Sequence, residues 1–378
     1  MKKLALVLVA LTVATPAWAQ FGALDRAIDK GMKAKRLIDI KISDAEERQI
    51  GEQVSAQLIT TFGVYQDADV AKYVSLVGNV MAQSSSRPSL QWEFIVLDTD
   101  GVNAFAAPGG LVHVTRGLLG LIKSEAELAG VLGHELTHIT GKHTINSIQK
   151  GNAVSFTTDE VSASGGLGQS LMTRFAQKAY SDLLNNKFDR NDENNADENG
   201  VQLANKVGYA PVGLANALTK LMERNKDRQE PNGLFASHPL MQERLTNIVR
   251  VIREKKLEAS ALGAERYAKN ITFDAKGIGE LEVVDPSLRG LTGGDGKSGE
   301  PAKTDEKKDE KKKEEKKGGF GLGRLISGGS QAQNTQTVAS AGGRAGWPDR
   351  DATGGTNRTK VPVKIERAEL DEFRKGIA

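Results

Sequence analysis

The chain has 378 residues, of which 39% are hydrophobic, so it is long enough to bury a sizeable core and to hold two domains. Its 51 basic and 48 acidic residues nearly cancel, and the net charge of +3 argues against a general role in nucleic-acid binding. The sequence holds no cysteine, which excludes disulfides, a lipid-anchoring cysteine and thiolate ligands, and leaves His, Asp and Glu for any metal site.

The first 19 residues are typical of a secretory signal peptide. Two lysines precede an apolar run over residues 4–14, and small residues at Ala17 and Ala19 mark a cleavage site. We predict cleavage after Ala19 and export of the mature protein. An uncleaved membrane anchor is the alternative, although the apolar run is short for a span of about 30 Å. No later segment approaches 18 apolar residues, so we expect no transmembrane segment in the mature chain.

Helical patterns dominate residues 20–285, which we predict to be the globular domain, because apolar residues recur there at helical spacing. The expected helices cover residues 43–62, 69–83, 124–141, 171–186, 192–206, 211–225 and 241–256. Two of them begin with serine and glutamate in capping-box spacing, Ser43 with Glu46 and Ser124 with Glu127.

Two segments alternate in hydrophobicity and are rich in β-branched and aromatic residues, which predicts strands over residues 90–98 and 111–115. The intervening residues 101–110 are turn-prone, and we expect them to form a loop. These patterns indicate an α+β fold, mainly helical, with a small β-sheet.

The composition changes beyond residue 285. Residues 303–317 are almost wholly Lys, Asp and Glu between glycine- and serine-rich stretches, which predicts a disordered linker over residues 290–345. The charged block could instead form a solitary, exposed helix. For residues 346–378 we expect either a short strand and helix or a tail that docks elsewhere on the protein.

The segment HELTH lies inside the helix expected over residues 124–141. His134 and His138 are four residues apart and project from one helix face, so both imidazoles can bind one ion, at about 2.0–2.1 Å if it is zinc. Glu135 lies beside that face, where a general base for a metal-bound water belongs. A catalytic zinc needs a third protein ligand. The downstream candidates are His143, His238 and the acidic cluster DRNDENNADENG.

Glu193 and Asp197 lie four residues apart within that cluster. On a helix, a carboxylate ligand and a carboxylate that orients another ligand would therefore share one face. A solvated helix start is the alternative for this asparagine-rich run. His113 lies in a predicted strand and His143 near the end of the motif helix, where a cation is favourable without any metal. We expect both of these histidines to be structural.

Together these motifs resemble the gluzincin metallopeptidases of the CAAX prenyl endoprotease, HtpX and BepA type. The resemblance rests on HELTH, on ENNAD about 55 residues later with Gly200, on SHP at residues 237–239, on NAFAAPGG at residues 103–110 and on EERQIGEQV near the N-terminus. It covers roughly residues 40–255. It implies a zincin-type domain whose small sheet packs against the HExxH helix, one Zn²⁺ per chain, and His134, His138 and Glu193 as its ligands.

The resemblance also implies roles for four further residues. Glu135 would be the base and later the proton donor, and Asp197 would orient the imidazole of His134. His238 would face the metal, either stabilising the oxyanion or closing the fourth position, and Arg244 would add positive charge at the oxyanion. The alternatives are a solvent-facing loop for His238 and the surface of a helix for Arg244.

The predicted function is that of a zinc-dependent endopeptidase, periplasmic and either free or peripheral to a membrane, which cleaves misfolded or misassembled envelope proteins. Outer-membrane assembly machinery is a candidate partner, and the strand over residues 111–115 could hold an extended peptide by edge pairing. Unlike HtpX, the chain shows no membrane-spanning helix, and unlike BepA it shows no tetratricopeptide array.

Two other functions compete with this one. The first is a periplasmic chaperone or assembly factor whose zinc site is silenced by His238 or by a lid over residues 151–190. The second is a peptidoglycan-linked scaffold that uses the charged linker and the tail.

Overall fold

The computed structural model describes residues 41–152, 168–185, 188–227, 241–281 and 358–377, with Leu234, His238 and two short strands. The predicted signal peptide, most of the predicted linker and residues 153–167 of the predicted lid lie outside the described residues. The elements are α2 Asp44–Phe62, α3 Ala68–Ser84, β1 Glu93–Leu97, β2 Ala104–Ala107, β3 Leu111–Thr115, α4 Arg116–Leu121, α5 Glu125–Thr140, α6 His143–Asn152, α7 Gln169–Asn185, α8 Arg190–Val207, α9 Gly213–Arg224, α11 Met241–Glu254, α12 Ala264–Asn270, a 3-10 turn Ile278–Glu280, β4 Val283–Val284, β5 Val338–Ala339 and α13 Arg367–Lys375.

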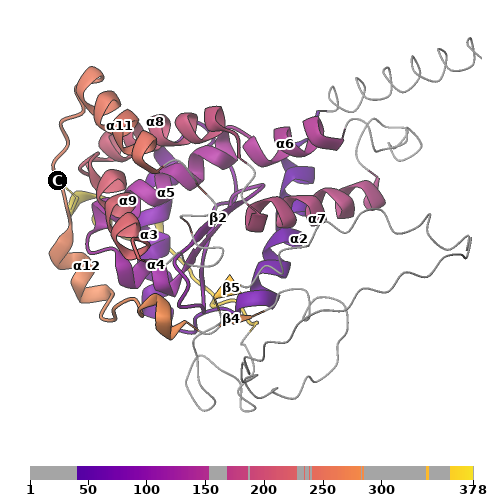
Figure 1. Cartoon of the computed structure of the whole chain (residues 1–378), viewed down its shortest axis with the longest axis horizontal. Coiled ribbons are helices and arrows are strands. Elements are labelled where there is room, and N and C mark those ends of the chain that lie inside the picture. Colours follow the sequence, from indigo (N-terminus) through magenta and orange to yellow (C-terminus); the bar gives the residue numbers. More distant parts are fainter. Residues whose placement is uncertain are drawn as a thin grey trace, which may run out of the picture.

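A three-stranded sheet lies between two groups of helices (Figure 1). The strand order is β1-β3-β2, and β3 pairs parallel with β1 and antiparallel with β2. Helices α2 and α7 pack together on one side of the sheet, and α3, α5, α8 and α9 lie on the other. The predicted fold class, mainly helical α+β with a small sheet, is confirmed.

Alternation along the strands divides the apolar side chains between two cores. In β1, Phe94 and Val96 point into the core formed with α3 and α5, whereas Ile95 and Leu97 point into the core formed with α2. Successive strand residues face opposite sides of a sheet, so a five-residue strand can serve both cores at once. The sheet is therefore buried on both faces.

Both predicted helix starts are observed, but only one carries the full capping box. Ser43 accepts the backbone N–H of Glu46, whose carboxylate accepts the Ser43 backbone N–H in return. Ser124 likewise caps α5 by accepting the N–H of Glu127. The Glu127 carboxylate, however, accepts the backbone N–H of Lys123, one residue before the expected position.

The loop prediction for residues 101–110 is wrong over its central part, where Ala104–Ala107 form β2. All four residues are apolar and three of them are alanines, so no polar–apolar alternation reveals them. The antiparallel pairing with β3 and burial on both sides fix the strand. The edge-pairing prediction for residues 111–115 is also wrong. Both sides of β3 are occupied by β1 and β2. Among the described residues, the outer side of β1 is bridged by Val64, which leaves β2 as the outer strand with an open edge.

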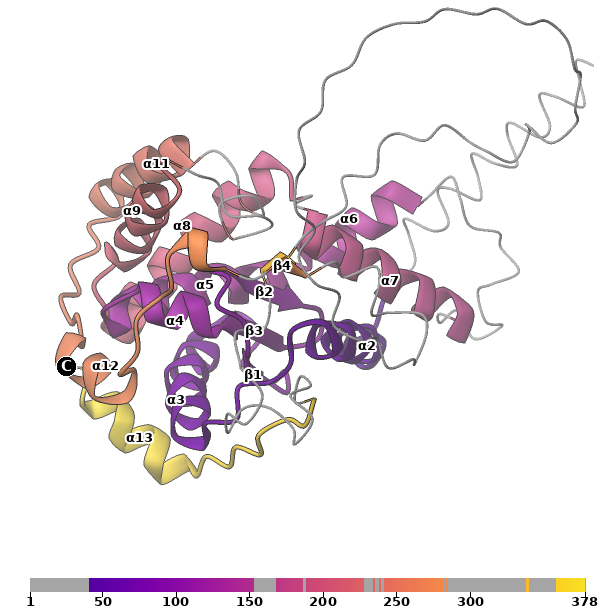
Figure 2. The same ribbon diagram turned by 60° about the horizontal axis from the view of Figure 1, so that its bottom comes forward.

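The C-terminal segment packs back onto the domain. Helix α13 lies along α3 (Figure 2), and its Leu370 and the following Ile377 are buried in the same core as α5. This is the helix expected near the end of the chain, whereas residues 358–366 form no strand. Upstream, β4 pairs with β5, whose two residues fall within the predicted linker. Among the helices described, none has both the length and the apolar character needed to cross a bilayer.

Candidate metal centre

The site forms where α5 and α8 cross at a pair of glycines. A Cβ atom added at Gly133 would lie 2.7 Å from the carbonyl oxygen of Gly200, and one added at Gly200 would lie 2.7 Å from the backbone nitrogen of His134. No side chain other than hydrogen fits between two helices at that distance. The close approach brings Glu193, two turns before Gly200, and Asp197, one turn before it, up to the HExxH motif.

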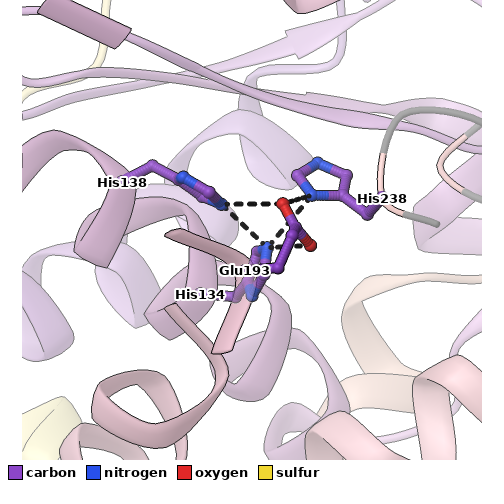
Figure 3. Close-up of side chains that lie close together, drawn as sticks. All are labelled: His134, His138, Glu193 and His238. Carbon is purple, nitrogen blue, oxygen red and sulfur yellow. Dashed lines mark hydrogen bonds and ion pairs between the residues drawn. The ribbon is translucent and has the colours of Figure 1, made fainter. Parts of the chain in front are cut away.

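Four side chains converge at this crossing: His134 and His138 from α5, Glu193 from α8, and His238 (Figure 3). All four are buried, and one donor atom from each lies within 4.8 Å of the other three. His134 Nε2 lies 3.0 Å from His138 Nε2 and 3.2 Å from His238 Nδ1. Glu193 Oε1 lies 2.8 Å from His238 Nδ1 and 3.6 Å from His138 Nε2.

Asp197 and Arg244 support this group from behind. Asp197 Oδ1 lies 2.9 Å from His134 Nδ1, the contact that the resemblance predicted. Arg244 donates to both carboxylate oxygens of Asp197, at 2.8 and 2.6 Å, and its guanidinium lies 3.2 Å from Glu193 Oε2. With only 2% of its surface exposed, Arg244 is not on a helix surface. Its guanidinium is engaged with the two carboxylates.

These contacts shift the pKa values of the carboxyl groups. Burial alone would raise the pKa of Asp197, but the charge and hydrogen bonds of Arg244 and the bond to His134 hold it well below its usual range. Burial would likewise raise the pKa of Glu193, which His238 and Arg244 instead lower strongly. Both carboxyl groups are therefore ionised at neutral pH.

The pKa values of His138, His238 and Glu135 are shifted in different directions by burial and by neighbouring charges. Burial, with the neighbouring His134, lowers the pKa of His138 well below its ordinary value, so His138 is neutral. Burial would also lower the pKa of His238, but the charge and hydrogen bond of Glu193 raise it. Burial raises the pKa of Glu135. The Oε1 atom of Glu135 lies 3.8 Å from His238 Nε2 and has no hydrogen-bond partner among the described residues.

The donor set fits a zinc ion. Four atoms held at about 2.0–2.1 Å around one tetrahedral zinc lie about 3.3 Å from one another. Four of the donor separations, 2.8 to 3.6 Å, bracket that value, and the distance from His134 Nε2 to Glu193 Oε2, 3.8 Å, is slightly longer. Imidazole and carboxylate ligands without thiolate suit zinc among the common divalent ions. The predicted ligand set and Glu135 are thus brought together, and His238 lies beside them rather than in a solvent-facing loop.

Two further residues contact the site. Among the described residues, His143, a candidate third ligand from the sequence, is not part of the cluster of donor atoms. Phe188 stacks on His138 with ring centroids 3.9 Å apart, and also lies 6.0 Å from His238. His143, expected to be structural, is the first residue of α6, and its Nδ1 lies 2.9 Å from Nδ1 of His138. His113 lies apart from the site, bonded through Nε2 to the Ser55 hydroxyl. Neither Phe188 nor His143 carries a spacing signal that links it to the motif.

The sequence profile described as peptidase family M48 matches residues 68–252. These residues hold the motif helix, α8 and Arg244. The chain carries a peptidase family M48 domain.

Three relatives illustrate what this M48 domain is similar to. A beta-barrel assembly-enhancing protease of Escherichia coli O157:H7 is 25% identical over 255 residues, 64% of this chain and 50% of the relative. Metalloprotease LoiP of Escherichia coli K12 is 26% identical, over 55% of this chain and 81% of LoiP. Mitochondrial metalloendopeptidase OMA1 of Schizosaccharomyces pombe is 32% identical, over 47% of this chain and 51% of the relative. The chain spans about half the length of the beta-barrel assembly-enhancing proteases that it matches.

Proposed function

We propose that this M48 protein is a zinc-dependent endopeptidase with one Zn²⁺ per chain, held by His134, His138 and Glu193. The observation that carries the proposal is the meeting of these three side chains with the buried Glu135, whose Oε1 has no hydrogen-bond partner among the described residues. A zinc ion held there would polarise the scissile carbonyl and lower the pKa of a water.

The chain's own residues would move the protons. Glu135 would accept a proton from the attacking water and pass it to the leaving amine nitrogen. Its raised pKa favours this exchange, because a proton carrier works best when its pKa lies near the working pH. His238, whose Nε2 lies 3.8 Å from Glu135, would donate a hydrogen bond to the oxyanion. Arg244 would act through Asp197 and Glu193, which it holds in place.

A peptide substrate would pair with an open sheet edge. Since β3 is central, we assign this role to β2, which packs against the motif helix α5. Main-chain pairing depends little on side chains, so the substrates would be unfolded or exposed segments. The names of the bacterial relatives and the predicted signal peptide support misfolded or misassembled envelope proteins of the periplasm as substrates, and outer-membrane assembly machinery as a partner.

Metal content and casein cleavage test the proposal on the protein purified without chelator. The natural chain should carry one zinc and cleave casein until chelator is added. Glu135→Gln should keep the zinc and the fold but lose cleavage, because the amide cannot accept the proton. Cleavage that survives in Glu135→Gln, or a natural chain without bound metal, would reject the proposal.

The competing function is a chaperone or assembly factor with a gated zinc site. The position of His238 favours it, because its Nδ1 reaches the same cluster as the three ligands and could close the position needed for water. Cells carrying Glu135→Gln would keep full function under this alternative. Casein cleavage that appears only in His238→Ala would instead indicate a gated endopeptidase.

A further inference from the structure

The two ligand histidines differ in what lies behind them. His134 turns Nδ1 toward Asp197, a carboxylate. His138 turns Nδ1 toward Nδ1 of His143, at 2.9 Å. The rings of His138 and His143 are nearly perpendicular, with an interplanar angle of 84° and centroids 4.9 Å apart. The ring centroids lie 2 Å farther apart than the two nitrogens, so the nitrogen-bearing edges of the rings face each other, as a hydrogen bond between two ring nitrogens requires.

The tautomers follow from the metal site. A ligand imidazole must leave its metal-facing nitrogen without a proton, and in His138 this nitrogen is Nε2, which lies among the donor atoms. The proton of neutral His138 then sits on Nδ1 and donates to Nδ1 of His143. His143 in turn carries its own proton on Nε2. The Asp192 carboxylate lies 3.7 Å from this nitrogen, too far for a hydrogen bond, and the His143 ring is hydrogen-bonded to the side chain of Asn195.

The backbone around His143 is shaped for this placement. A Cβ atom added at Gly141 would lie 2.5 Å from Nε2 of His143, so the missing side chain at this position leaves room for the imidazole. Gly141 ends α5, and its φ of −80° is open to any residue. The requirement for glycine is therefore set by the neighbouring ring rather than by the backbone conformation.

We propose that His143 is a positioning residue that fixes the tautomer and ring orientation of His138. The inference rests on the proposed metal site and extends it from His138 to His143. Partners of this kind raise the affinity of a site for its metal about 10–100-fold.

The zinc dissociation constant tests the role directly, by competition with a chelating dye at pH 7. His143→Leu removes the acceptor, whereas His143→Asn keeps an oxygen near the position of Nδ1. His113→Leu is the matched control, because it removes another buried histidine that does not contact the site. Circular dichroism of each metal-free variant establishes that it is folded. The cobalt-substituted absorption spectrum reports any change in the ligands' arrangement.

We expect His143→Leu to weaken zinc binding about 10–100-fold and to alter the cobalt spectrum. His143→Asn should recover most of the affinity, and His113→Leu should bind like the natural chain. Unchanged affinity in His143→Leu, or equal losses in the Leu and Asn variants, would overturn the positioning role while leaving the proposed peptidase intact. A natural chain that binds no zinc, or a His138→Ala variant that binds it equally well, would overturn both.

Discussion

Gly200→Ala tests whether the close crossing of α5 and α8 builds the site. The new methyl group would lie 2.7 Å from the backbone nitrogen of His134 and 2.9 Å from the carbonyl carbon of Gly133. Both atoms belong to a helix backbone, so neither can rotate away, and the two helices must separate by about 0.5–1 Å. Functional sites tolerate displacements of only about 0.5 Å, and Glu193 and Asp197 would move with α8.

The separation should affect metal binding more than stability. Overpacking costs about 1–3 kcal/mol, and the better helix propensity of alanine returns about 0.5–1 kcal/mol. We therefore expect the free energy of unfolding, measured in urea, to fall by at most about 2.5 kcal/mol. Zinc affinity should fall about 10–100-fold, because the support from Asp197 is displaced. Asn199→Ala, at the neighbouring exposed position of α8, is the control. If Gly200→Ala binds zinc as the control does, the site does not depend on the glycine crossing.

Three further predictions concern other parts of the chain. Removing residues 358–378 should lower the free energy of unfolding by about 4–6 kcal/mol in urea, because it exposes the sites of Leu370 and Ile377, whereas deleting residues 290–330 should change it little. Burial, with the charge of Lys360, lowers the pKa of His113 to about 3, so the unfolded chain binds a proton there below about pH 6.5 that the folded chain does not. The stability of the natural chain should thus fall about 2 kcal/mol more than that of His113→Gln between pH 7 and pH 5, and equal losses would contradict this burial effect. Mass spectrometry of the exported protein should find Gln20 at the N-terminus, and a retained leader would contradict the predicted cleavage.

Local patterns predict the helices of this fold well because each carries its own signal. Ser43 with Glu46 places the start of α2, and Ser124 with Gly141 brackets α5, since caps act within one turn of the chain. Strand β2 carries no such signal. Its four apolar residues, three of them alanines, become a strand only through pairing with β3, which lies beyond the turn that follows.

The residues of the site also fall into two groups, those that local spacing predicts and those that only the packed structure identifies. The i, i+4 spacing of His134 and His138 is a property of one helix, so it can be recognised before the fold is known. The roles of Arg244 and His143 depend on burial. The helical pattern alone predicts an ordinary arginine on an amphipathic helix for Arg244. Its role follows from the packing of α11 against α8, which pairs Arg244 with Asp197. The sequence predicts a cation near a helix end for His143. Its role follows from the position of its ring, which lies next to Gly141 and His138.

The motif helix is held at both ends by residues far away in the sequence. At its start, the fully buried Glu125 accepts the hydroxyl groups of Tyr73 and Tyr209 and pairs with Arg266, whose guanidinium lies 4.1 Å from the centre of the Phe373 ring in α13.

At the other end of the helix, Arg87 donates to the carbonyl oxygen of Ile139 while pairing with the buried Glu47 of α2. A helix fixed at both ends and pressed against Gly200 in the middle has little freedom to slide or rotate. The geometry of the HELTH segment therefore depends on contacts that reach from α2 to the C-terminal helix. Helix α13 packs on the same core as the motif helix, although the charged stretch separates the two in sequence.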